Sequence, residues 1–192
     1  DDRYTPLVQA AYAAAAAKDT NRALAIAEDI LRLGTPTPDL PRAYVKWCGE
    51  NHKRAEQGLI KLIGQTEKGA GTLRAVLAID VYRDGLKDVA KARSMAYDYL
   101  SKSPTDDGWT EEITSFLYDS ASGEETFKKD LATISASART FPHLSGFQER
   151  IWKRSPQDKN RKRAWQSSAK AHQNNSITKL WRSTLEKGGK SG

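Results

Sequence analysis

Cys48 and His52 are the residues best placed for chemistry, because they stand four positions apart in the sequence. On a continuous helix this spacing puts both side chains on one face, which suits two zinc ligands or a thiol–imidazole pair. Gly49 lies between them and indicates a helix boundary at that point. The other histidines, His143 and His172, are distant in sequence. We therefore expect neither a metal site nor a catalytic pair, and the single cysteine excludes an intramolecular disulfide.

Adjacent carboxylates are the other pattern that could support acid–base chemistry. They occur at residues 106–107 (Asp-Asp), 111–112 (Glu-Glu) and 124–125 (Glu-Glu), each near an expected helix start. Carboxylates in a first helical turn are stabilised by the helix dipole, which accounts for them without catalysis. Residues 69–71 (Gly-Ala-Gly) lack the Lys-Ser/Thr that follows in a phosphate-binding loop. The sequence predicts a protein that is not an enzyme and has no cofactor.

The stretch from residue 18 to residue 44 has the clearest structural pattern. Four of its apolar residues fall on one helix face at i, i+4, i+7 and i+8: Ala23, Ala27, Ile30 and Leu31. Asp19 or Thr20 can cap the start of this helix, and Asn51 is expected to cap the helix at about 52–65. Gly34 is expected to end the first of these helices in a left-handed conformation. Three prolines then prevent the helix from continuing: Pro36, Pro38 and Pro41.

The same spacing recurs further along the chain. It is found at Ala55, Leu59, Leu62 and Ile63 and again at Ala92, Ala96, Tyr99 and Leu100, which are steps of 32 and 37 residues. Steps in the thirties are typical of repeated helix pairs, although unrelated amphipathic helices can share this spacing by chance. We expect helices at about 5–17, 20–33, 41–50, 52–65, 72–84, 88–102, 109–121 and 124–140. The predicted fold class is all-α, a short right-handed superhelix of antiparallel helix pairs.

Residues 4–104 resemble tetratricopeptide and pentatricopeptide repeats. The resemblance rests on Tyr4 with residues 6–8 (PLV), Asp19, residues 22–24 (RAL), 33–34 (LG), 38–39 (PD) and 46–51 (KWCGEN), and on Pro104. It implies an α-solenoid that binds a partner. The pentatricopeptide family implies a setting linked to organellar RNA, such as a mitochondrial or plastid ribonucleoprotein. The tetratricopeptide family implies an adaptor that binds only protein. Arg42 stands where a base-reading residue would be needed, which argues against a code of one base per repeat.

In such a solenoid, the first helix of each helix pair lines the concave groove. The polar and aromatic residues of these helices are therefore the predicted partner contacts: Gln9, Tyr12, Lys46, Glu50, Arg74 and Arg83. Most other large rings are expected to fill the core between helices, opposite small alanine residues. These are Tyr44, Trp47, Tyr82, Tyr97, Tyr99 and Trp109.

The charge is distributed unevenly along the chain. The net charge is +7 over 192 residues, yet residues 150–192 contain twelve Lys/Arg and only two acids, a net +10. Residues 1–149 therefore hold 19 bases and 22 acids, a net −3. A basic tail on a mildly acidic body indicates contact with an anionic partner, for which RNA is the leading candidate. The expected contacts are Lys153, Arg154, Lys159, Arg161, Lys162, Arg163, Trp165, Lys170, Lys179, Trp181 and Arg182.

The alternative for this tail is a solvated basic face whose tryptophans pack onto the last helices. We divide the chain into a helical-repeat body, residues 1–142, and a basic extension, residues 143–192. No stretch has the ~20 consecutive apolar residues of a membrane-spanning helix. The single cysteine fits a reducing intracellular compartment. If the N-terminus is processed, a mitochondrion or plastid is the expected location; if it is not, the cytoplasm is expected. The predicted function is a non-catalytic scaffold subunit of a larger assembly, and a protein-binding adaptor is the alternative.

Overall fold

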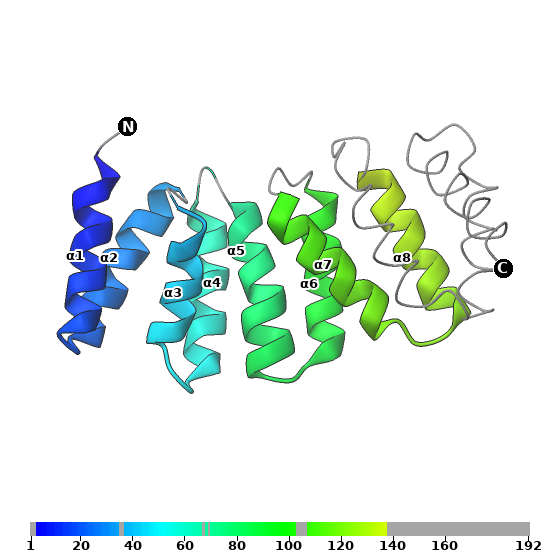
Figure 1. Ribbon diagram of the computed structural model, residues 1–192, viewed down its shortest axis with the longest axis horizontal. Coiled ribbons are helices and arrows are strands. Elements are labelled where there is room, and N and C mark those ends of the chain that lie inside the picture. Colours follow the sequence, from blue (N-terminus) through cyan, green and yellow to red (C-terminus); the bar gives the residue numbers. More distant parts are fainter. Residues whose placement is uncertain (1–2, 35–36, 67, 69, 103–106, 138–192) are drawn as a thin grey trace, which may run out of the picture. The chain divides into compact units, whose positions relative to one another are not determined.

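The polypeptide forms a succession of short helices joined by tight turns (Figure 1). The structure, a computed structural model, describes residues 3–34, 37–66, 68, 70–102 and 107–137. All regular secondary structure in these ranges is helical, which confirms the predicted all-α class for the part of the chain they cover.

The observed helices follow the expected ones closely, and most of their ends lie within two residues of the predicted ones. Their bounds are α1 (Tyr4–Ala16), α2 (Thr20–Leu33), α3 (Asp39–Trp47), α4 (His52–Gln65), α5 (Ala70–Val76), η1 (Leu77–Gly85), α6 (Val89–Ser101), α7 (Asp107–Ser120) and α8 (Glu124–Ser137). The main difference concerns the helix expected at 72–84. It begins as α5 and continues without a break as η1, a π-helix of nine residues.

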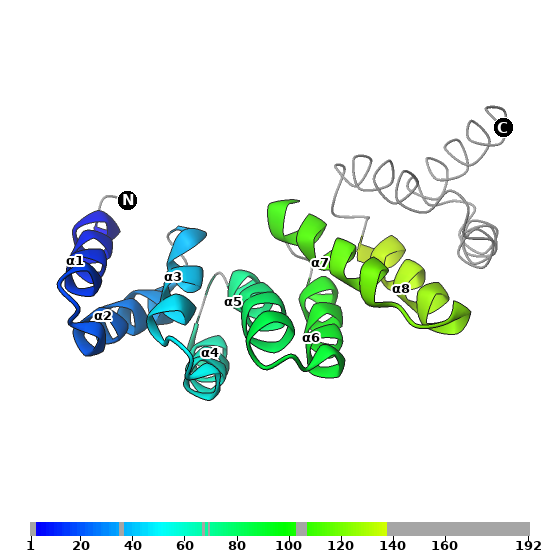
Figure 2. The same cartoon turned by 60° about the horizontal axis from the view of Figure 1, so that its bottom comes forward.

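The chain divides into two compact units, Asp1–Asp98 and Tyr99–Gly192. In the first unit, α1 packs on α2, α2 packs on α3 and α4, and both α3 and α4 pack on α5 and η1. When α5 and η1 are taken as one continuous helix, successive helices of this unit run in opposite directions (Figures 1 and 2). In the second unit, α7 packs on α8. Neighbours in sequence are therefore neighbours in space within each unit, as expected of helical hairpins.

The predicted apolar faces form the core of the first unit. Ala23, Ala27, Ile30 and Leu31 of α2 are buried, as are Ala55, Leu59 and Leu62 of α4 and Ala92 and Ala96 of α6. Ile63, the fourth predicted member of the α4 face, is half-buried. Small residues let the helices approach, and the large aliphatic side chains supply most of the hydrophobic free energy, about 2 kcal/mol for each one fully buried. Of the rings predicted to lie in the core, Tyr44, Tyr82, Tyr99 and Trp109 are buried, whereas Trp47 and Tyr97 are half-buried.

The helices α2, α4 and α6 all begin in the same way. In each, an Asp or Asn side chain accepts a hydrogen bond from the backbone N–H three residues later: Asp19 from Arg22 (3.3 Å), Asn51 from Arg54 (3.1 Å) and Asp88 from Lys91 (3.1 Å). A residue with positive φ lies just before each cap: Lys18 (61°) and Lys87 (56°) directly precede theirs, and Gly49 (62°) lies two residues before Asn51. These side chains satisfy amides that the helix leaves unpaired. The predicted caps at residues 19 and 51 are therefore confirmed.

The end of α2 differs from the prediction. Gly34 has φ 151° and ψ −175°, so it leaves the helix in an extended conformation that favours glycine. The αL geometry that we expected at this position is wrong. The hydroxyl of Thr66, at the end of α4, donates to the backbone oxygens of Leu31 (2.9 Å) and Leu62 (2.6 Å). The C-terminal ends of α2 and α4 are thereby joined.

The π-helix η1 turns five of its nine residues into the core: Leu77, Ala78, Ile79, Val81 and Tyr82. Its wide hydrogen-bonding pattern persists at the end, where Leu86 N donates to Val81 O at 2.7 Å. Gly85 closes it against α4, because a Cβ at Gly85 would lie 2.7 Å from Nδ1 of His52. Only glycine fits this approach without displacing the imidazole ring.

The second unit has its own core and a buried hydroxyl pair. Ile113 and Leu117 of α7 and Ile134 of α8 are buried. The hydroxyls of Tyr99 and Thr110 share a hydrogen bond of 3.0 Å, which satisfies two polar groups removed from water.

Candidate interaction surface

Cys48 and His52 do not share a helix face. Cys48 caps the end of α3 and His52 is the first residue of α4, so the helix boundary predicted at Gly49 is confirmed. The imidazole of His52 packs against Gly85, and its buried Nδ1 has no hydrogen-bond partner among the described residues. No group of three or more His, Cys, Asp or Glu side chains is arranged as metal ligands in the part of the chain that the structure describes.

Cys48 is a buried thiol whose surroundings disfavour the thiolate. Burial is the largest cause that raises its pKa, and the carboxylate of Glu28 raises it further, while the guanidinium of Arg54 acts in the opposite direction. Since the thiolate is the nucleophilic form, a raised pKa makes this cysteine a poor nucleophile at neutral pH. Cys48 therefore packs as a small apolar side chain at the end of α3.

A partly exposed aromatic pair connects α1 and α3, the first helices of the first two helix pairs. The rings of Tyr12 in α1 and Trp47 in α3 meet edge to face, with their centroids 5.1 Å apart and their planes at 78°. Tyr12 is 41% exposed and Trp47 is half-buried. Burial raises the pKa of Tyr12, and the nearby Asp39 carboxylate raises it further. Large rings that hold each other in place and still face solvent are typical of the anchors in protein interfaces.

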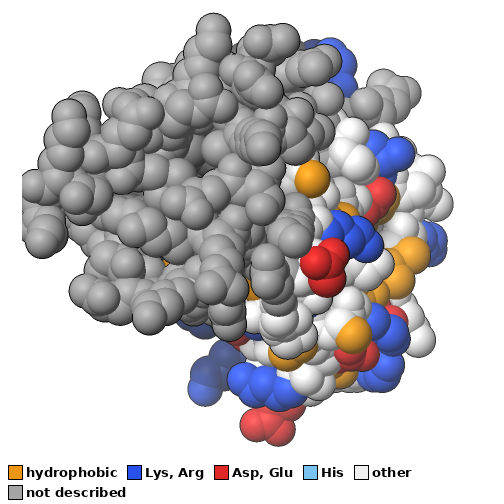
Figure 3. Space-filling view, turned by 90° about the vertical axis from the view of Figure 1, so that its right-hand side faces the viewer, with side chains coloured by type: hydrophobic (Ala, Val, Ile, Leu, Met, Phe, Trp, Pro, Cys, Tyr) orange, Lys and Arg blue, Asp and Glu red, His pale blue; other side chains and the backbone are white. Residues whose placement is uncertain are grey.

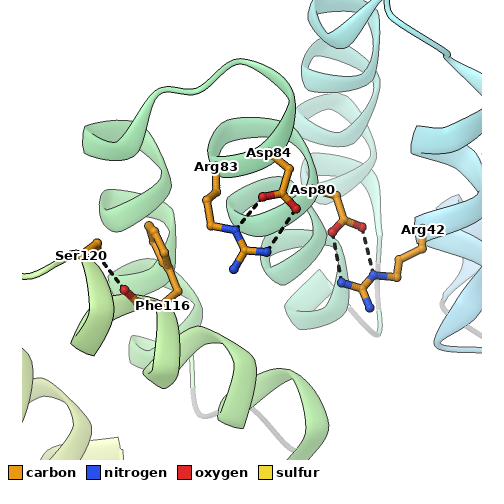
Figure 4. Close-up of polar contacts among 6 residues, drawn as sticks. All are labelled: Arg42, Asp80, Arg83, Asp84, Phe116 and Ser120. Carbon is orange, nitrogen blue, oxygen red and sulfur yellow. Dashed lines mark hydrogen bonds and ion pairs between the residues drawn. The ribbon is translucent and has the colours of Figure 1, made fainter. Parts of the chain in front are cut away.

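Two ion pairs continue this surface toward η1 (Figure 4). Arg42 of α3 donates from Nε and an Nη atom to the two carboxylate oxygens of Asp80, at 3.0 and 3.1 Å. Arg83 also makes a bidentate contact, with the two carboxylate oxygens of the neighbouring Asp84, at 2.7 and 3.1 Å. The first pair joins two helices that are 38 residues apart in sequence, whereas the second lies within η1. Bidentate geometry fixes the orientation of both partners.

We call this surface the first-helix face and define it by the solvent-facing residues of α1, α3 and η1: Gln9, Tyr12, Arg42, Lys46, Trp47, Asp80, Arg83 and Asp84. The Tyr12–Trp47 contact joins α1 to α3, and the Arg42–Asp80 pair joins α3 to η1. The face is therefore continuous across three helices of one unit. It combines exposed aromatic area with charges that are already paired.

The structure places the six predicted groove residues as follows. Gln9 and Tyr12 are exposed on α1, Lys46 is exposed on α3, and Glu50 is exposed in the turn after it. Arg83 lies on η1 in its pair with Asp84. Arg74 is directed elsewhere, because its Nε contacts the Asp98 carboxylate of α6 at 2.8 Å and its side chain is only 17% exposed. The first-helix face thus includes four of the six and neither Arg74 nor Glu50.

Sequence reasoning missed Asp80 and placed Trp47 in the core. Asp80 pairs with a residue 38 positions away, and no local spacing signals such a partner. Trp47 stands at the end of α3, where the ring of Tyr12 covers only part of it. The eleven predicted tail contacts all fall within residues 153–182, outside the described residues, as does the predicted boundary at 142–143.

Figure 3 shows one side of the molecule, where Lys/Arg and Asp/Glu side chains lie next to each other on the described surface. No helix among the described residues is long and apolar enough to cross a membrane. Comparison of the chain with protein-family models, with curated proteins and with solved structures finds no match. The function must therefore be inferred from the residues and contacts themselves.

Proposed function

We propose that this chain is a non-catalytic helical-repeat binding subunit of a larger assembly. In this proposal the first-helix face holds a segment of a protein partner, and the basic C-terminal extension contacts RNA. The observation that carries the protein-binding part is the Tyr12–Trp47 pair, because it is a braced aromatic surface that remains 41% exposed at Tyr12.

The chemistry of the first-helix face supports a protein partner. Aromatic residues and arginine are the side chains most enriched in the central part of protein interfaces. Arg42 and Arg83 already have carboxylate partners, so a protein that covers them does not leave a lone charge in the interface. Neighbouring exposed groups on α3, such as Lys46, then remain to fix the partner's orientation.

The repeat interpretation is supported by the starts of the second helices. The caps Asp19, Asn51 and Asp88 are 32 and 37 residues apart, the same steps as those between the apolar faces of these helices. Three helices that share both a face and a cap at the same spacing fit a repeated hairpin better than unrelated helices. A short superhelix related to tetratricopeptide or pentatricopeptide repeats is the fold that we propose on this basis.

The RNA-binding part rests on charge. A net charge of +10 within residues 150–192 creates a strong attraction for a polyanion, and its tryptophans offer surfaces on which unpaired bases can stack. An organellar ribonucleoprotein is the setting implied by the pentatricopeptide resemblance. The second candidate is an adaptor that binds only protein, with the tail as a docking arm, and the first-helix face fits that function equally well.

RNA binding by the full chain separates these two functions. Binding of a 20-nucleotide oligouridine should weaken steeply with salt, because each neutralised phosphate releases counterions. Replacing the central tail cluster (K159Q, R161Q, K162Q and R163Q) should make the slope of log K against log salt shallower by about 3, at about 0.7 for each contact. Absence of wild-type binding at low salt would remove the RNA part and favour the adaptor.

The protein-binding part is tested by photo-crosslinking in an extract of the native source. A benzoyl-phenylalanine placed at Tyr12 should give a discrete crosslinked product with the partner. The control is the same group at Ile60, which is 49% exposed on α4. Equal crosslinking at both positions would contradict a specific role for the first-helix face.

A further inference from the structure

The three repeated helix starts in the first unit bring basic side chains to one edge. The turns that precede α2, α4 and α6 all lie on the same side of this unit, the lower side in Figure 1, and they stay on that side in the rotated view of Figure 2. Each helix has a basic residue at the position whose backbone N–H serves the cap: Arg22, Arg54 and Lys91. Because all three lie three residues after the cap of their helix, their side chains occupy the same position in the first turns of α2, α4 and α6.

Further lysines accompany these residues. We call the whole set the basic edge, and it consists of six exposed side chains: Lys18, Arg22, Lys53, Arg54, Lys87 and Lys91. The carboxylates on the same edge are Asp19, Glu50, Glu56 and Asp88, which leaves a net charge of +2. Asp19 and Asp88 are directed at backbone amides rather than at the bases. The first turns of three helices add partial positive charge in the same place.

Most of these bases have no acidic partner. Within the described residues, no carboxylate forms an ion pair with Lys18, Arg22, Arg54 or Lys87, whereas Lys53 contacts Glu56 at 3.5 Å. The ammonium of Lys91 lies over the ring of Tyr82, 5.7 Å from its centre. In this lack of ion pairs, the edge differs from the arginines elsewhere in the unit.

Elsewhere in the unit, four arginines each bind a carboxylate: Arg32 with Asp29, Arg42 with Asp80, Arg74 with Asp98 and Arg83 with Asp84. Among the described residues of this unit, Lys46, Lys61 and Lys68 are also exposed without an ion pair, but they are scattered over separate positions, whereas Lys18, Arg22, Arg54 and Lys87 all lie at the starts of second helices. An unpaired, exposed base is free to exchange its water and counterions for an external anion.

The repetition of the edge indicates the kind of anion. A single small anion would need convergent donors, whereas these bases are spread over the starts of three helices, α2, α4 and α6. Of these, α2 packs directly on α4, at the usual spacing of about 8–10 Å between helix axes, so the edge matches an extended polyanion that passes from one helix start to the next. An acidic protein would also need apolar contact area, and Val89 is the only large hydrophobic residue among the described ones on this edge that is strongly exposed.

We propose that the basic edge binds the phosphate backbone of RNA, as a second contact on the folded body beside the C-terminal extension. This inference rests on the proposed RNA-binding function and adds a located surface to it. Contacts to phosphates position an RNA without reading its sequence, so the edge would bind RNA of any sequence.

The test compares two full-length triple variants with the same change in net charge. The edge variant carries R22Q, R54Q and K91Q, in which the backbone N–H that serves each cap is retained. The control variant carries K61Q, K68Q and K102Q, three exposed lysines without an ion pair in the described residues, near or beyond the C-terminal ends of α4 and α6. Thermal unfolding of both variants at the wild-type temperature would show that the substitutions leave the fold intact.

Binding of a 20-nucleotide oligouridine is measured from low to moderate salt. The edge variant should bind at least about tenfold more weakly at low salt, with a slope shallower by about 2, at about 0.7 for each lost contact. The control variant should keep the wild-type slope. Equal weakening of both variants would overturn the assignment to this edge and leave only a general charge effect.

Two further arms separate the edge from the proposed function. If the tail variant loses RNA binding and the edge variant does not, the inference about the edge fails while the proposed function stands. If the wild-type chain binds no RNA, both fail. If the edge variant loses binding to polyglutamate or to vesicles of phosphatidylserine but keeps its affinity for oligouridine, the surface recognises another anion and the RNA assignment is wrong.

Discussion

The hydroxyl of Tyr44 in α3 lies directly over Gly58 in α4, in the space that a Cβ at Gly58 would occupy. The ring is buried, and its hydroxyl donates a hydrogen bond of 3.0 Å to the carboxylate of Glu28 in α2. One side chain thus connects three helices. Gly58 permits this arrangement because it has no side chain.

Replacing Gly58 with alanine should destabilise the protein by about 1–3 kcal/mol, because the new methyl group displaces a buried ring. This loss exceeds the helix propensity that alanine gains over glycine, about 1 kcal/mol. Urea unfolding followed by circular dichroism measures the difference. In a Tyr44→Phe background the same substitution should cost less, since the overlapping oxygen is gone, and a double-mutant cycle isolates this coupling.

Gly64 is the matched control within the same helix. A Cβ at Gly64 would meet nothing within 4 Å, so Gly64→Ala should be neutral or stabilise by up to about 1 kcal/mol. If Gly58→Ala and Gly64→Ala changed stability equally, the contact between Tyr44 and Gly58 would have no energetic role.

The helix caps give a second prediction. Asn51→Ala should destabilise by about 1 kcal/mol, because it leaves an amide in the first turn of α4 without its acceptor. Asn51→Asp should retain stability, since aspartate caps as well as asparagine, and it fills the same role at residues 19 and 88 in this chain. Thermal unfolding of both variants is the measurement. A loss of equal size in Asn51→Asp would show that the cap is not what stabilises this turn.

The sequence was sufficient to predict what depends on local pattern. The apolar faces of α2 and α4 and the caps at residues 19 and 51 are confirmed, because spacing and cap chemistry are short-range properties. The π-helix was not predicted, because the apolar spacing of residues 73–81 also fits an ordinary helix. Contacts distant in sequence surround η1, namely the pair between Arg42 and Asp80 and the approach of Gly85 to His52. The first-helix face was predicted in part. Of its members that were not predicted, Arg42, Trp47 and Asp80 have partners distant in sequence, whereas Asp84 binds its neighbour Arg83.

Alkaline pH should destabilise the folded protein through its buried phenol and thiol groups. Burial, as the largest cause, raises the pKa of Tyr44, and Glu28 raises it further; burial likewise raises the pKa values of Cys48 and Tyr82. A group with a raised pKa in the folded state keeps its proton to higher pH there than in the unfolded chain. The unfolded chain therefore releases protons first, and stability falls as pH rises.

The free energy of unfolding should therefore stay constant through these groups up to about pH 8 and decline above it, as cysteine and tyrosine titrate in the unfolded chain at their ordinary pKa values of 9.0 and 10.0. Urea unfolding at a series of pH values gives the slope. Tyr44→Phe should lower stability at neutral pH, since the bond to Glu28 is lost, but make the decline above about pH 9 shallower. An unchanged slope in this variant would contradict the assigned role of Tyr44.

The Arg42–Asp80 pair should stabilise η1 more than it stabilises the whole protein. Its side chains are 45% and 18% exposed, so Asp80→Asn should cost at most about 1 kcal/mol of global stability. The pair joins α3 to the π-helix through two side-chain hydrogen bonds, however, and its loss should increase local opening of residues 77–85. Hydrogen exchange measured by mass spectrometry on peptides from this segment should show faster exchange in Asp80→Asn than in wild type. Arg83→Gln is the comparison, because the Asp84 carboxylate that Arg83 binds at 2.7 Å lies within η1 itself. Equal acceleration in both variants would mean that η1 responds to any lost charge, and that α3 does not hold it in place.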